Sequence, residues 1–259
     1  MRQTIILLLA LLSIVVACKR RSTQESEDKQ AKQLLQGLWT TDDTEEPAML
    51  VKGDSIYYPD SASMPVRFWI FQDSIYMQGQ NLNGYKILKQ TNAFFSFNNQ
   101  NGDEVNLFRS SNKDLMASFG YHVYAMNLFD KSGSDTIVST DMGFYDCQIR
   151  TCTTSERVIK STYNDNGIEV DNAYLDNVST LTLRSRDSVV YKHDFLKQEF
   201  SNYIPRDFIA HCILRNLEFD RADRKALFFN ATIGIPDASS GYVVEVRITP
   251  DGKMSKRLR

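Results

Sequence analysis

The sequence predicts a mainly β protein of two antiparallel β-meander modules: an N-terminal barrel or bent sheet, and a C-terminal sheet with one short helix. Three observations support this fold class. Apolar and polar residues alternate in short runs after residue 38, as in strands with one buried face. Turn-forming residues recur roughly every 8–12 positions. The chain also holds 15 Phe, 12 Tyr and 2 Trp, which are residue types that favour strands.

Residues 1–17 have the layout of a secretory signal peptide. Arg2 supplies a positive charge, residues 5–16 are almost entirely apolar, and Ala17 is small. The apolar run is shorter than the roughly 20 residues that a membrane-spanning helix needs. We therefore expect a cleaved signal rather than a transmembrane segment.

The sequence Val15-Val16-Ala17-Cys18 resembles the lipobox of bacterial lipoproteins. The resemblance implies cleavage before Cys18, a diacylglyceryl thioether on its sulfur and a fatty-acylated amino group, for example with palmitate. Several acyl chains would make membrane attachment effectively permanent, whereas a single chain binds only marginally. The alternative is an ordinary secretory signal followed by a chance cysteine.

Residues 18–36 are predicted to form a lipidated polar tether, because Lys, Arg, Gln, Glu and Ser dominate them. A helical turn at 31–36 would be stopped by Gly37. Lys19 replaces the aspartate that retains lipoproteins in the inner membrane under enteric-type sorting rules. We therefore expect a cell-envelope protein anchored in the outer membrane, with its periplasmic or surface face left open.

Residues 37–130 are predicted to form the first meander, with about eight or nine strands. Asn101-Gly102 is a strong hairpin-turn signal, and residues 115–119 and 122–128 alternate like further strands. The opening Gly37-Leu38-Trp39 resembles the start of lipocalin-like modules in exported lipoproteins. That resemblance implies a barrel whose base is closed by Trp39, which is then structural rather than ligand-binding.

Residues 136–259 are predicted to form the second, β-rich module, after a polar boundary at 130–135. Its expected elements are extended segments at 157–163 and 178–184, a short helix at 195–203, and a hairpin of strands 227–235 and 242–248 joined by 236–241. The hairpin is the clearest of these patterns, because apolar residues alternate strictly in both arms.

Four segments of the second module match a known pattern: Asp176-Asn177-Val178, His193-Asp194-Phe195, residues 228–236 and residues 242–248. Over roughly residues 155–250 they resemble an uncharacterised lipoprotein family, a domain of unknown function, from gut-type bacteria. The shared features are packing patterns, so the resemblance implies no activity.

Aromatic residues of the first module are candidate ligand contacts. Strand alternation sends Phe68 to one face and Trp69 and Phe71 to the other, and Tyr76 follows on the next strand. Two apolar faces on one strand indicate burial on both sides, a domain interface, or a surface for a sugar or lipid.

Cys147 and Cys152 are candidates for a disulfide, because an exported protein folds in an oxidising compartment. A bridge requires a tight turn between them, and two free thiols are the alternative. Cys212 is expected to be a small buried residue.

Five Asp-(Ser/Thr)-small or aliphatic triplets resemble the O-glycosylation sequon of exported proteins from the same bacterial group. The candidate acceptors are Ser55, Ser61, Ser74, Thr136 and Ser188. The alternative explanation is turn chemistry, because Asp-Ser pairs favour turns between strands.

No familiar catalytic pattern is present in the sequence: it has no G-x-S-x-G elbow, Walker loop, H-E-x-x-H pair or calcium loop. We therefore assign no catalytic residue, metal ligand or cofactor. Without the signal the net charge is near −3, so nothing indicates a nucleic-acid partner. The expected function is non-enzymatic binding of a small molecule, glycan or envelope protein. The alternatives are an envelope glycan hydrolase and a structural subunit of an outer-membrane complex.

Overall fold

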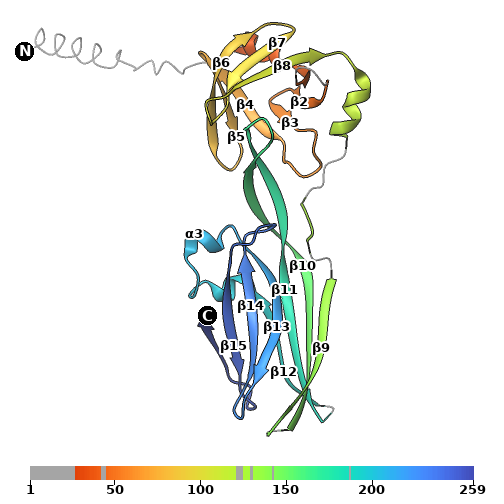
Figure 1. Ribbon diagram of the computed structural model, residues 1–259, viewed down its shortest axis with the longest axis vertical. Coiled ribbons are helices and arrows are strands. Elements are labelled where there is room, and N and C mark those ends of the chain that lie inside the picture. Colours follow the sequence, from red (N-terminus) through yellow and green to blue (C-terminus); the bar gives the residue numbers. More distant parts are fainter. Residues whose placement is uncertain (1–26, 42–44, 121–124, 129–130, 142, 187) are drawn as a thin grey trace, which may run out of the picture.

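The computed structural model describes residues 27–41, 45–120, 125–128, 131–141, 143–186 and 188–259. The predicted signal peptide and Cys18 lie outside these residues. A closed β-barrel sits at one end of an elongated molecule and a two-sheet sandwich at the other (Figure 1). The predicted mainly β, antiparallel fold is confirmed.

The barrel contains eight antiparallel strands, each paired with the next, and it closes where β1 pairs with β8. The strands are β1 (Gly37–Thr40), β2 (Pro47–Lys52), β3 (Ser55–Tyr57), β4 (Val66–Phe71), β5 (Ser74–Gln78), β6 (Leu82–Gln90), β7 (Phe94–Asn98) and β8 (Glu104–Ser110). Every second residue is apolar and points inward: in β4, Val66, Phe68 and Ile70 are buried, and the residues between them are half-buried or exposed.

Helix α2 (Lys29–Leu35) lies where a helical turn was predicted at 31–36, but it belongs to the barrel, which corrects the prediction that residues 18–36 form a tether. The Asp28 carboxylate caps the helix by accepting the backbone N–H groups of Gln30 and Ala31, at 3.0 and 2.9 Å. Leu35 is fully buried in the barrel core. The folded body therefore begins well before Gly37.

The segment after β8 departs from the predicted strands. Lys113–Phe119 forms the 3-10 helix η1, whose start is capped when the Asn112 side chain accepts the N–H of Asp114 at 3.0 Å. The strand predicted at 122–128 falls partly on residues 121–124, outside the described residues, and Met126 forms only an isolated bridge with Tyr174.

The sandwich packs two four-stranded antiparallel sheets face to face around one apolar core. The first sheet has the order β12-β11-β10-β9, with β9 (Lys131–Thr140), β10 (Gly143–Tyr163), β11 (Glu169–Ser185) and β12 (Ser188–Leu196). The second has the order β13-β14-β15-β16, with β13 (Ile213–Ala222), β14 (Leu227–Gly234), β15 (Gly241–Ile248) and β16 (Met254–Leu258). Strands β14 and β15 confirm the predicted final hairpin.

The helix predicted at 195–203 is largely wrong. Phe195 still belongs to β12, and only one 3-10 turn, η2 (Lys197–Phe200), follows before the short helix α3 (Arg206–Ile209). Asp194, which directly precedes the predicted helix, accepts a 2.6 Å hydrogen bond from the Thr180 hydroxyl on the neighbouring strand.

The predicted Cys147–Cys152 bridge is contradicted, because both residues lie on the single strand β10 and their thiols are free. Five residues of extended chain separate them by about 16 Å, and no turn intervenes. Cys212 is buried, as predicted, and its thiol donates to the Phe208 carbonyl at 3.1 Å.

Candidate functional site

The interior of the barrel is filled by side chains. Its fully buried members include Trp39, Tyr58, Phe68, Tyr85, Phe95 and Phe97. The Tyr58 hydroxyl meets the sulfur of Met77 at 3.7 Å, and burial raises the pKa of Tyr58 far above its usual value. An eight-stranded barrel is just wide enough for its own side chains. The packed interior therefore offers no ligand cup among the described residues.

The end of the barrel beside α2 is closed by Trp39 and Arg109. The indole N–H of Trp39 donates to the Leu35 carbonyl at 2.7 Å, and the Arg109 guanidinium lies 4.6 Å from the centroid of the indole. Arg109 also donates to the carbonyls of Leu34, Gln36 and Asn92. One arginine thus ties the helix to the strands, and Trp39 has the structural role predicted for it.

The opposite end of the barrel is closed by the tip of the β10–β11 hairpin, which rises out of the sandwich (Figure 1). Ile168 and Val170 are buried in the barrel core. The backbone N–H of Glu169 donates to the Tyr85 hydroxyl at 3.2 Å, and the Asp171 carboxylate accepts the backbone N–H of Gln80. The second module therefore completes the core of the first.

The outer face of the barrel carries the predicted aromatic group. Trp69 and Tyr76 are cross-strand partners on β4 and β5, and their rings are nearly parallel, 11° apart with centroids 5.7 Å apart. Tyr76 lies opposite Gly84 on β6, where an added Cβ would approach the tyrosine ring to 3.0 Å. The missing side chain at Gly84 gives Tyr76 room to lie against the sheet.

A hollow of about 270 Å³ lies beside Trp69, between the start of α2 and strands β4 and β5 of the barrel. It is lined by Glu27, Lys32, Asp54, Arg67, Phe68, Trp69 and Gln78. An aromatic ring next to carboxylate, amide and guanidinium groups is the composition of a polar-ligand site. Phe71 points the same way as Trp69 but ends its strand opposite Ser74, and neither it nor Tyr76 lines the hollow.

The charges of the hollow are organised around Lys32. Its ammonium group contacts Glu27 at 2.5 Å and Asp54 at 2.7 Å. Burial alone would lower the pKa of Lys32, but hydrogen bonds to Asp54 and Glu27 raise it. The same lysine lowers the pKa of Asp54. The sequence analysis did not single out these three residues, because Glu27 fell in the predicted polar tether and Lys32 in its helical turn.

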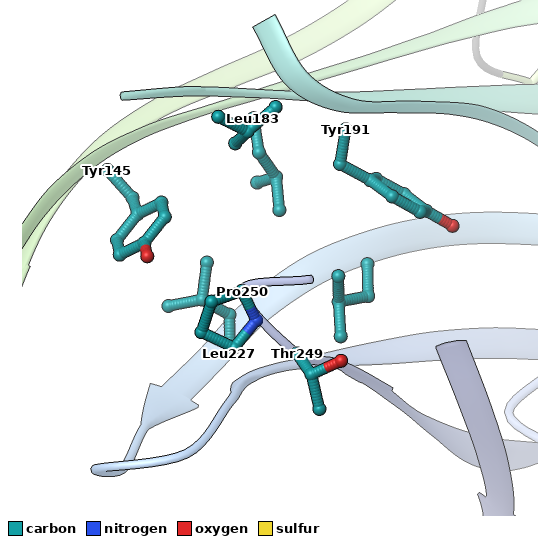
Figure 2. A pocket seen from close by; sticks show the side chains of 8 residues that line it. Tyr145, Leu183, Tyr191, Leu227, Thr249 and Pro250 are labelled. Atoms are coloured by element: carbon teal, nitrogen blue, oxygen red, sulfur yellow. The ribbon is translucent and has the colours of Figure 1, made fainter. Parts of the chain in front are cut away.

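A second, smaller crevice opens between the two sheets at the far end of the sandwich (Figure 2). It is lined by Tyr145, Leu183, Val190, Tyr191, Leu227, Ile248, Thr249 and Pro250. Its volume is about 10 Å³, enough for about one water molecule. We therefore do not regard it as a ligand site.

The candidate acceptors for glycosylation lie at the starts of strands or in turns. Ser61 and Ser188 are exposed, and Ser55, Ser74 and Thr136 are half-buried. Asp60 supports the turn interpretation, because its carboxylate accepts the backbone N–H of Ala62 at 2.9 Å and that of Ser63 at 2.6 Å.

Neither a metal-binding cluster nor a membrane-spanning helix is present in the described part of the chain. No group of three or more His, Cys, Asp or Glu side chains there is placed to hold a metal ion. None of the helices there combines the length and the apolar composition that crossing a membrane requires.

No curated protein matches the chain in sequence. One family model does match, described as a domain of unknown function (DUF4738), over residues 112–256. That region holds η1 and all of the sandwich except the last two residues of β16, including the hairpin that closes the barrel, and it spans more than half of the 259 residues. The chain therefore belongs to the DUF4738 family.

Proposed function

We propose that this protein is a lipid-anchored, non-enzymatic binding module of the cell envelope whose ligand is a glycan held against Trp69. The observation that carries the proposal is the near-parallel Trp69–Tyr76 pair beside a polar hollow, on the outside of a barrel with a filled interior. A sugar ring presents an apolar C–H face to an aromatic ring, and its hydroxyls bond to carboxylate, amide and guanidinium groups.

The lipid anchor would place this hollow close to the membrane. Glu27, which lines it, is nine residues after Cys18, and nine extended residues reach about 32 Å at most. The polar composition of residues 19–26 and the lipobox-like sequence support an outer-membrane lipoprotein. The up-and-down order of the eight strands and the position of Trp39 support a lipocalin-like origin of the barrel.

The hydrolase alternative is less well supported by the same hollow. Glycoside hydrolysis needs one protonated and one ionised carboxyl group on opposite sides of the sugar. Glu27 and Asp54 instead share one ammonium group, and the pKa of Asp54 is lowered rather than raised. This arrangement suits hydrogen bonding to a ligand better than proton donation.

The glycan proposal is tested by titrating the full chain with envelope and dietary oligosaccharides while following tryptophan fluorescence. Trp69 is half-exposed and Trp39 is buried, so a bound sugar should protect Trp69 from iodide quenching. Trp69→Ala and Tyr76→Ala should weaken binding by about tenfold or more, measured by calorimetric titration because Trp69→Ala removes the fluorescent reporter. The matched control is Phe94→Ala, which removes a half-exposed ring elsewhere on the barrel. Equal affinity in all variants would overturn the proposal.

The anchor proposal has its own test. Cys18→Ala should leave the folded body intact and release it from washed membranes, because no acyl chain can then be attached. If the Cys18→Ala protein still sedimented with those membranes, the lipoprotein assignment would be wrong. Intact mass of the native protein should also exceed that of residues 18–259 by a diacylglyceryl group and a fatty acid.

The structural-subunit alternative is supported by apolar side chains at the far end of the sandwich. Ile137 and Phe144 are 79% and 70% exposed there. A pull-down from detergent-solubilised membranes tests it, and recovery of no stoichiometric partner would count against it.

We also propose O-glycosylation at Ser61 and Ser188, the exposed acceptors. Mass spectrometry of the Ser61→Ala and Ser188→Ala proteins would detect it as the loss of a glycan mass.

A further inference from the structure

A cluster of arginines lies on the solvent-facing side of the second sheet, far from the barrel. Arg221, Phe228, Arg247 and Ser255 are cross-strand partners in one row, and Glu245 and Arg257 are partners in the next. They surround a hollow of about 360 Å³ that these residues line together with Lys256. Three guanidinium groups therefore converge from strands β13, β15 and β16.

A buried carboxylate holds two of these arginines in place. The side chain of Glu245 is 6% exposed, and its two oxygens contact Arg221 at 2.8 Å and Arg257 at 3.0 Å. The Arg221 guanidinium also lies 4.1 Å from the centroid of the Phe228 ring. Each guanidinium carries five N–H donors. Arg221 also donates to the carboxylate of Asp220, and the donors that neither Glu245 nor Asp220 uses remain for a ligand in the hollow.

The hollow has an excess of positive charge. Arg247 forms no ion pair among the described residues. The lining contains three arginines, and Glu245 is its sole acidic side chain. Lys256 adds no charge to the hollow, since its ammonium group contacts Glu199 at 2.7 Å and lies over the rings of Phe195 and Phe200 in the sandwich core. Asp220, which contacts Arg221, is also paired with Arg259 at 3.2 Å, so the balance around the hollow remains two positive charges.

We propose that this hollow binds a phosphate group. A phosphate monoester carries close to two negative charges at neutral pH and three strong acceptor oxygens. Arginine forks match phosphate oxygens in pairs, and charge-assisted bonds of this kind are stronger than neutral ones. Glu245 is then a positioning residue, because it orients Arg221 and Arg257 and touches no phosphate.

The experiment uses the full chain in zwitterionic detergent, with inorganic phosphate as the probe at constant ionic strength. Calorimetric titration should show saturable binding that Arg247→Gln weakens about tenfold or more. Arg247 is the variant of choice because no ion pair of the fold depends on it. Arg224→Gln is the matched control, since it removes the same charge from a side chain that is 89% exposed, contacts Asp141 and does not line the hollow.

Three outcomes are decisive. Loss of binding in Arg247→Gln but not in Arg224→Gln supports the site. Absence of saturable binding, or an equal loss in both variants, overturns it, because only the overall charge would then matter. Glu245→Gln should weaken phosphate binding while circular dichroism shows that the protein remains folded. Unchanged binding would show that Glu245 does not position the arginines, and it would overturn the proposed site.

The source of the phosphate is resolved by two further probes. Glycerol 3-phosphate and soluble short-chain phosphatidic acid carry the same phosphate, with and without acyl chains. Equal affinities indicate a free phosphate-bearing solute. A gain for phosphatidic acid that short-chain phosphatidylcholine does not share indicates a lipid headgroup. Both results support the phosphate site, and neither depends on the glycan site at Trp69.

Discussion

The backbone N–H of Glu169 in the second module donates a hydrogen bond to the hydroxyl of Tyr85 inside the first, at 3.2 Å. With Ile168 and Val170 in the barrel core, this bond makes one folding unit of two modules that the sequence pattern separates. Burial also raises the pKa of the Tyr85 hydroxyl, which keeps it protonated at physiological pH.

Ile168→Ala should destabilise the barrel by about 2–5 kcal/mol, the usual cost of such a cavity in a core. The barrel can be followed by tryptophan fluorescence, since Trp39 and Trp69 both lie in it, and the sandwich by labelling of buried Cys212. The two transitions should coincide in the unmodified chain and separate in the variant. Ile137→Ala, at an exposed position, is the control and should change neither transition.

Arg109→Gln should lower the free energy of unfolding by about 2–4 kcal/mol, because three backbone carbonyls lose a charged donor. Arg109→Lys should restore part of the loss, since it keeps the charge over Trp39 but not the fork of donors. Urea unfolding measures both. Arg184→Gln, on an exposed side chain, serves as the control, and an equally stable Arg109→Gln protein would contradict the described closure of the barrel end.

Glu199 should make stability fall in acid. Burial favours its neutral form, but hydrogen bonds from Lys256, His193 and the Leu196 N–H lower its pKa in the folded state. Its contribution is therefore complete above the unfolded pKa of about 4.3 and is lost as the pH falls through the lower folded pKa. Thermal melts of Glu199→Gln from about pH 6 to 3 should show a flatter pH dependence. Glu156→Gln, at an exposed position, should keep the original slope.

The cysteines should behave as unpaired thiols. After denaturation without reductant, Cys147, Cys152 and Cys212 should all react with a thiol reagent. In the folded protein, burial raises the pKa of Cys147 to about 12 and that of Cys212 to about 11, so both should react slowly at pH 8. Fewer than three reactive thiols in the denatured chain would show that a disulfide forms after all.

Local patterns predicted those elements whose partners are close in sequence. The alternation in β14 and β15 gave the correct hairpin because each strand pairs with its neighbour across a short loop. Residues 115–119 alternate just as well, yet only Phe119 in η1 is buried, since no neighbouring strand is available to them. Alternation indicates which face is apolar, but it does not supply a pairing partner.

The candidate site was predicted only in part, because the sequence pattern reveals contacts between adjacent strands but not contacts between distant segments. Trp69 and Tyr76 were identifiable because adjacent strands bring them together. Lys32 and Asp54 meet only through the docking of α2 on the barrel, a contact that residues 18–36 did not reveal by composition. The Asp28 cap of α2 was the available signal for a folded helix there.

The hairpin tip has an evolutionary consequence. The family region begins at residue 112, after the last barrel strand, yet it includes Ile168 and Val170, which are buried only because the barrel surrounds them. A descendant that lost the barrel by recombination would expose an aliphatic tip on a projecting β-ribbon, a surface prone to self-association. The family region can therefore be inherited safely only together with a domain that covers the tip of its β10–β11 hairpin. Relatives without this barrel should carry either another covering domain or polar residues at the positions of Ile168 and Val170.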